Sequence, residues 1–141
     1  MKILIRVVID TNIWVSFLIG KTLAGLRDKI LHNHVAILFS DELFEELIEV
    51  VHRPKFRKYF SLEDIHELTT LLDMKVTFVK VKEHFFECRD AKDNFLLDIC
   101  FAGNADYLVT GDPDLLELHS FRQTKILDYR SFEKVIEEMK S

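Results

Sequence analysis

The sequence predicts a single α/β domain, residues 1–141, built on a parallel β-sheet. Apolar runs of strand length alternate along the chain with helical patterns, which is typical of parallel sheets. Two of these runs end on an acid, Asp10 and Asp112, and open α/β sheets hold their ligands just beyond the carboxyl ends of the strands. The 141 residues, 48% hydrophobic and 30% charged, suffice for one domain with a sizeable core.

The composition argues against several classes of protein. No run approaches the roughly 18 apolar residues that a membrane span needs, and Arg6 interrupts the apolar N-terminal stretch, which therefore predicts a first strand rather than a signal peptide. We expect a cytoplasmic protein with two reduced thiols, Cys88 and Cys100. The net charge of -5 argues against a protein that coats nucleic acid by bulk charge. It is compatible with a nucleic-acid enzyme, because carboxylates that bind a metal make the metal-free sequence acidic.

The first half of the chain is predicted to alternate strands and helices. Runs of β-branched and apolar residues predict strands, and apolar residues at helical spacing behind Ser, Thr, Asp or Asn predict capped helices. In order, we expect a strand over residues 3–9, helices over residues 13–18 and 23–31, a strand over residues 35–39, and helices over residues 40–51 and 61–72. Asp10 is costly to bury at the end of the first strand unless it is paired or holds a cation, so it is predicted to belong to a site.

Glu46 is the glutamate of the helix over residues 40–51 that is best placed to turn inward. At about 100° per residue it falls closest to the edge of the apolar stripe marked by Leu43 and Val50. The other three glutamates of this helix suit a solvated face.

A basic run with interleaved aromatic residues follows, over residues 52–60, in an otherwise acidic chain. Its cations would contact RNA phosphates while an aromatic ring stacks on a base. They would equally suit a helix C-terminus, where cations complement the dipole, or a surface for a partner protein or a second copy. The residues concerned are Arg53, Lys55, Arg57 and Lys58.

The second half continues the alternation. We expect a strand over residues 75–79, a helix over residues 95–102, a strand over residues 105–112, a short helix over residues 114–118, a strand over residues 124–127, and a final helix capped by Ser131. Residues 81–88 carry no assignable pattern. Asp93 opens the helix over residues 95–102 and shares a face with its buried side chains. Asp90 suits a cap or an outer acid, and Asp98 points away from Asp93, which predicts an outer charge.

Four acids are thus predicted to meet: Asp10, Glu46, Asp93 and Asp112. Crowded like charges destabilise a fold unless a cation neutralises them, and carboxylate oxygens suit Mg²⁺ or Mn²⁺. Such ions support phosphoryl chemistry. The sequence contains no pair of Cys or His with transition-metal spacing, no Ser-His-Asp set and no glycine-rich phosphate loop.

The segments that carry these acids resemble the PIN-domain family, and within it the toxins of bacterial toxin–antitoxin pairs related to VapC. The resemblance covers nearly the whole chain and rests on Val-Ile-Asp-Thr-Asn at residues 8–12, on residues 40–56 with Arg-Pro-Lys-Phe at their end, on Arg-Asp-Ala-Lys-Asp-Asn at residues 89–94, and on residues 105–116. Many relatives have proline where this chain has Ala91, a local change that leaves the acids intact.

The resemblance implies a three-layer α/β/α domain with a central parallel sheet of four or five strands. It also implies an endoribonuclease that depends on Mg²⁺ or Mn²⁺, cleaves RNA without using the ribose 2′-hydroxyl as nucleophile, and has a cognate antitoxin as partner. Asp10 and Asp93 would bind the metal, and Glu46 would orient the attacking water. Asp112, with Asp114 outside it, would hold a second metal or its waters. Hydrogen bonds from Thr11, Asn12 and Thr110 would fix these carboxylates.

Two other functions stay open. The first is a PIN fold kept only as an RNA- or protein-binding module, which the loss of an acid would favour, although all four are present. The second is a metal-dependent phosphatase with an aspartyl nucleophile, but that chemistry needs a carboxylate two residues after the nucleophile, where this chain has Asn12. An exposed apolar patch would favour a homodimer.

Overall fold

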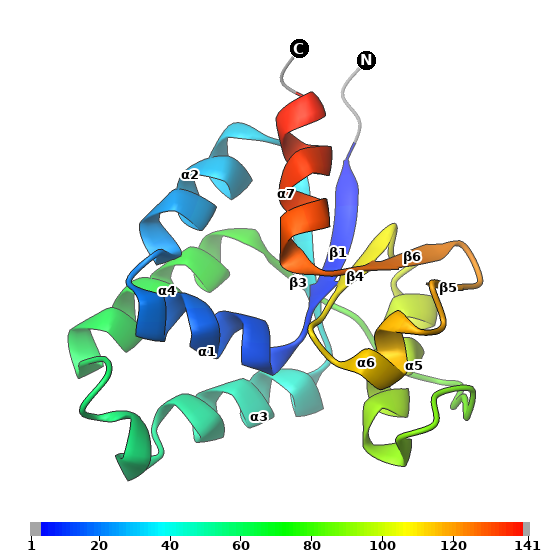
Figure 1. The fold of residues 1–141 in the computed structure, drawn as a ribbon, viewed down its shortest axis with the longest axis horizontal. Coiled ribbons are helices and arrows are strands. Elements are labelled where there is room, and N and C mark those ends of the chain that lie inside the picture. Colours follow the sequence, from blue (N-terminus) through cyan, green and yellow to red (C-terminus); the bar gives the residue numbers. More distant parts are fainter. Residues whose placement is uncertain (1–3, 140–141) are drawn as a thin grey trace.

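A computed structural model, which describes residues 4–139, shows a six-stranded sheet in the order β3-β2-β1-β4-β6-β5 (Figure 1). β1 pairs in parallel with both β2 and β4, β3 and β6 extend the parallel sheet on either side, and β5 pairs antiparallel at one edge. The strands are β1 (Ile5–Ile9), β2 (Val35–Phe39), β3 (Val76–Phe78), β4 (Tyr107–Val109), β5 (Ser120–Phe121) and β6 (Thr124–Leu127). The predicted α/β fold with a mainly parallel sheet is confirmed.

The sheet has one strand more than the four or five expected. β5 is only two residues long, too short to show the alternation by which a strand is recognised in a sequence. It exists because a two-residue turn joins it to β6, and Arg122 in this turn takes a left-handed φ of 55°. The start of the apolar run at Ile3 lies outside the described residues.

Helices lie on both faces of the sheet. They are α1 (Thr11–Gly20), α2 (Leu23–His32), α3 (Asp41–Val51), α4 (Leu62–Lys75), α5 (Asn94–Ala102), α6 (Pro113–Leu116) and α7 (Tyr129–Glu138), with 3₁₀ turns η1 (Pro54–Phe56) and η2 (Ala91–Asp93). The chain moves outward from β1 through β2 to β3 and then returns through α5 to β4. Right-handed crossovers in opposite directions put their helices on opposite faces, so α5 covers the face opposite to α1–α4. α7 packs beside α1, where the rings of Tyr129 and Phe17 meet edge to face.

Local side chains explain where several helices begin. The Ser40 hydroxyl caps α3 by accepting from the Leu43 amide, and Ser61 forms a capping box with Asp64 at α4. The prediction that Ser131 caps the last helix is wrong, because Asp128 accepts from the Ser131 amide and α7 begins earlier. No helix within residues 4–139 combines the length and apolar character needed to cross a membrane.

Residues 79–90 cross over α5 as a connector without helix or strand. Asp98 of α5 anchors it, because its Oδ1 accepts from the Phe85 amide at 2.8 Å and its Oδ2 lies 2.9 Å from His84 Nδ1. The Asp98 side chain is only 7% exposed. The prediction of an outer charge at Asp98 is therefore wrong: this carboxylate lies under the connector, which the helical angle alone could not reveal.

Asp98→Ala is expected to lower the free energy of unfolding by about 1–3 kcal/mol, because the half-buried Phe85 amide loses its acceptor. Urea denaturation followed by circular dichroism measures the change. Asp98→Asn keeps a carbonyl oxygen and should lose less. Equal stability of the Ala variant and the wild type would show that the connector is held elsewhere.

Candidate metal centre

Asp10 and Thr110 meet at the carboxyl edge of the sheet. Asp10 directly follows β1 and Thr110 directly follows β4, and these strands are parallel neighbours. The Thr110 hydroxyl, fully buried, donates to Asp10 Oδ2 at 2.8 Å. Two strand ends far apart in the sequence are therefore joined through a side-chain hydrogen bond.

The same threonine also positions Asp112. Thr110 Oγ1 accepts from the Asp112 amide at 3.1 Å, and Asp112 Oδ1 accepts from the Asp114 amide at 2.8 Å, which starts α6. Asp112 is thus fixed from both sides. Its carboxylate also faces that of Asp93, with which it interacts directly.

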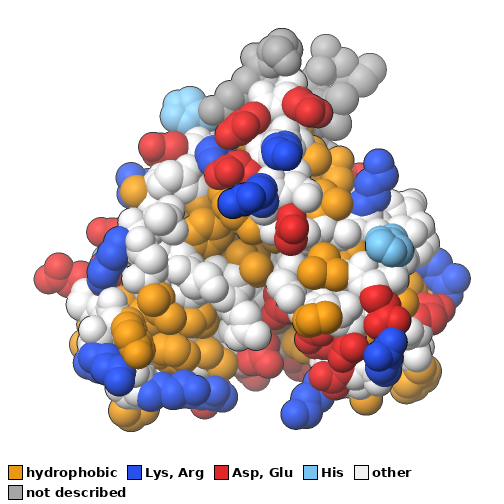
Figure 2. Space-filling model, viewed as in Figure 1, with side chains coloured by type: hydrophobic (Ala, Val, Ile, Leu, Met, Phe, Trp, Pro, Cys, Tyr) orange, Lys and Arg blue, Asp and Glu red, His pale blue; other side chains and the backbone are white. Residues whose placement is uncertain are grey.

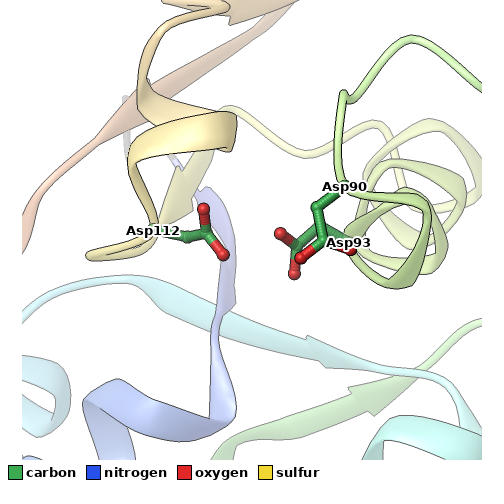
Figure 3. Close-up of side chains that lie close together, drawn as sticks. All are labelled: Asp90, Asp93 and Asp112. Carbon is green, nitrogen blue, oxygen red and sulfur yellow. The ribbon is translucent and has the colours of Figure 1, made fainter.

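Three carboxylates converge between α5 and α6: Asp90, Asp93 and Asp112 (Figure 3). Each offers one oxygen, and these three oxygens lie within 4.8 Å of one another. Asp90 and Asp93 project from η2 and its cap toward Asp112 at the start of α6. We call these three residues the acidic cluster.

Asp90 was expected to be a cap or an outer acid, and it does cap η2 by accepting from the Lys92 amide at 3.0 Å. It nevertheless also joins the acidic cluster. The reason is the 3₁₀ turn: at three residues per turn, side chains i and i+3 lie above one another, so Asp90 and Asp93 face the same way. The spacing was visible in the sequence, but the type of turn was not.

The electrostatics of the site are those of crowded acids. Burial, followed by the adjacent Asp112 carboxylate, raises the pKa of Asp93 to about 7. Burial also raises the pKa of Asp10, against the hydrogen bonds from Thr110 and from the Asn12 amide, with Glu46 and Asp112 adding repulsion. Metal-free, the site is therefore held at an electrostatic cost that a cation would relieve.

The residues fit a divalent cation. Asp93 Oδ2 is buried and accepts no hydrogen bond from any residue within 4–139. A buried carboxylate oxygen without a donor is unfavourable unless a cation or a proton binds it. Three convergent hard oxygen ligands suit Mg²⁺ or Mn²⁺, which keep several of their waters.

Two other predicted acids flank the acidic cluster. Glu46 is exposed, and its Oε2 accepts from the buried Thr11 hydroxyl at 2.7 Å. Glu46 and Asp10 both lie outside the set of oxygens within 4.8 Å, at least among the described residues. Asp114 faces Arg89, whose Nη1 lies 3.9 Å from its Oδ1. Of the four predicted acids, Asp93 and Asp112 share the acidic cluster with Asp90, whereas Asp10 and Glu46 lie beside it, near enough for their charges to interact with it or with each other.

Asn12 contacts Asp10 through its backbone. Its backbone amide, rather than its side chain, bonds the Asp10 carboxylate.

The basic run after α3 is exposed but partly engaged within the chain. Arg53 pairs with Glu49 at 2.9 Å, and Lys55 and Lys58 lie over the rings of Phe56 and Tyr59. Figure 2 shows cations along the lower left edge of this face, over η1, and acids gathered at the lower right, over α6. The two regions lie on one face of the molecule. Contact of the basic run with RNA or with a partner stays a prediction.

Fold and site together define a small α/β domain with a metal-type acidic centre at the carboxyl edge of its sheet. The chain belongs to the PIN domain family, which residues 6–114 match. It is 32% identical over 122 residues to an uncharacterized protein of the archaeon Methanocaldococcus jannaschii, covering 83% of this chain and 77% of that protein. Proteins with a PIN domain are typically metal-dependent nucleases.

Thr110→Val is expected to weaken Mg²⁺ binding about 10- to 100-fold, because Asp10 and the Asp112 amide lose the hydroxyl that orients them. Isothermal titration calorimetry measures the affinity. Thr110→Ser keeps the hydroxyl and serves as the matched control. If Val and Ser variants bind Mg²⁺ equally well, the hydroxyl does not organise the site.

Proposed function

We propose that this chain is an endoribonuclease that depends on Mg²⁺ or Mn²⁺, and that it acts in the cytoplasm as the toxin of a toxin–antitoxin pair. One observation carries the ribonuclease proposal: the acidic cluster, one member of which, Asp93, has a buried oxygen, Oδ2, without a hydrogen-bond donor. Membership of the PIN domain family supports the same reaction.

Each acid has a distinct task in this proposal. Asp90, Asp93 and Asp112 would hold the metal, with Asp10 beside them. When bound, the metal supplies Lewis acidity toward water and the phosphodiester. Glu46, which is exposed and accepts a hydrogen bond from Thr11, would orient the attacking water and accept its proton. Thr110 and the Asn12 amide keep Asp10 oriented.

Cleavage of RNA in the presence of Mg²⁺ or Mn²⁺ by the wild type, compared with Asp10→Asn, tests the proposal. We expect the variant to lose at least about 100-fold in rate, and EDTA to abolish the wild-type reaction. Equal cleavage by both proteins would contradict the proposal that Asp10 belongs to the metal site. Release of inorganic phosphate from a small monoester, without RNA cleavage, would instead favour the phosphatase.

The toxin role has its own test. Induced expression of the wild type is expected to arrest growth of the host, and Asp10→Asn is expected not to. Co-expression with a neighbouring small reading frame should relieve the arrest if that frame encodes the antitoxin. If the wild type cleaves RNA but its expression does not affect growth, the toxin role is refuted and the ribonuclease function remains. Sedimentation of the purified chain would show whether it forms a homodimer.

A further inference from the structure

We propose that the cavity between α3 and α5 receives a nucleobase of the RNA substrate, and that it selects bases with an exocyclic amino group. This inference rests on the proposed ribonuclease function, because it names what the same enzyme would bind beside its metal centre. The cavity has a volume of about 560 Å³, within the range of sites for small ligands.

The cavity lies next to the metal centre. Ser40, on its wall, directly follows β2 just as Asp10 follows β1. The register that pairs Val7 with Ile37 brings Ser40 level with Asp10 when it is continued along the strands, and neighbouring strands are about 4.8 Å apart. On the other wall, Phe95 projects from α5 together with Asp98 and Ile99, about 200° around the helix from Asp93. A nucleotide in the cavity would therefore lie one strand away from Asp10, which flanks the acidic cluster.

The apolar walls suit the flat face of a base. Val79 and Val81 come from the connector, and Phe95 and Ile99 from α5. Phe95 is half-buried, so part of its ring is open to a ligand. Proteins that bind single-stranded RNA hold unstacked bases against aromatic rings and read their edges by hydrogen bonds.

The polar side chains that line the cavity are mainly acceptors. Asp41 and Glu42 line it, and both are exposed. His84 Nδ1 faces the carboxylate of Asp98 and must donate to it, which leaves Nε2 of a neutral ring as an acceptor. Lys80 is the one cation of this lining. Acceptors favour adenine, cytosine and guanine, whose amino groups donate, over uracil, which has no such group. A phosphate would be repelled by the carboxylates.

Binding of AMP, CMP, GMP and UMP to the full chain, followed by ¹H–¹⁵N NMR without metal, tests the inference apart from catalysis. The three nucleotides with amino groups should shift amides at the start of α3, in residues 79–84 and along α5. They should bind at least about fivefold tighter than UMP. Absence of binding, or binding of UMP as tight as the others, would overturn the inference.

Two variants locate the effect in the cavity. Glu42→Gln should reduce the preference against UMP, because the amide can also donate, whereas Glu45→Gln on the same helix lies outside the cavity lining and should not. Val81→Trp should fill the cavity and abolish binding of all four nucleotides while the remaining spectrum shows an intact fold. Unchanged binding by both cavity variants would place the ligand elsewhere and refute the proposal.

The RNA assay separates this inference from the proposed function. If the wild type cleaves RNA with metal but binds none of the nucleotides, the proposed ribonuclease function stands and the proposed base site is refuted. If the wild type binds the nucleotides with the stated preference but never cleaves RNA, the proposed base site stands and the proposed ribonuclease function is refuted.

Discussion

Asp93→Asn is expected to reduce metal-dependent RNA cleavage by more than about 100-fold and, at the same time, to stabilise the metal-free protein. The first effect follows because Asp93 contributes the buried oxygen that no hydrogen bond satisfies. The second follows because burial and the Asp112 charge disfavour its ionised form. After allowance for solvent screening, we expect the gain in the free energy of unfolding at pH 8 to be about 1–2 kcal/mol.

The opposite signs of these two effects make the test specific. Single-turnover cleavage assays measure the first, and urea denaturation in EDTA measures the second. Asp73→Asn, which removes an exposed acid of α4, a helix that contributes no residue to the site, is the control and should change neither quantity. Loss of activity accompanied by loss of stability would indicate a structural role for Asp93 instead of a ligand role.

Affinity for Mg²⁺ is expected to be about tenfold higher at pH 8 than at pH 6, because Asp93 must lose its proton to bind a cation and its pKa is about 7. A rise in pH has the opposite effect on the metal-free protein, whose stability it lowers. Since the pKa in the folded state is raised above the ordinary value of 3.8, the contribution of Asp93 to stability is complete below about pH 4 and is lost as the pH rises through 7.

Titration calorimetry at the two pH values, in buffers of different ionisation enthalpy, measures both the affinity and the proton released. In Asp93→Asn the pH dependence should largely disappear together with most of the affinity. A wild-type affinity that is equal at pH 6 and pH 8 would show that no group with a pKa between them binds the metal.

The sequence predicted the fold from particular elements. Strands β1, β2, β3, β4 and β6 were predicted because their side chains are largely apolar or β-branched, and the helices between them because their apolar residues recur at helical spacing. β5 was not predictable, because its two residues become a strand only by pairing with β6. The cap of α7 was misplaced because Asp128 and Ser131 are both good caps, and the choice depends on the backbone there.

The residues of the candidate site also fall into those that the sequence could place together and those that it could not. Asp10 and Asp112 could be predicted to lie together because each follows a strand, and parallel strands end at one edge. The sequence could not show that Asp90 shares their oxygen cluster, since this depends on a 3₁₀ turn. Nor could it show that Asp98 lies buried beneath an irregular connector.

By itself the sequence determined which residues form strands and helices and which acids lie at strand ends, because these depend on the period of apolar residues along the chain. Only the tertiary structure decided which carboxylate oxygens meet, which of them remain without a donor, and where a cavity opens beside them. Those features depend on the packing of α5, α6 and the connector against one edge of the sheet, and therefore on contacts between residues far apart in the sequence.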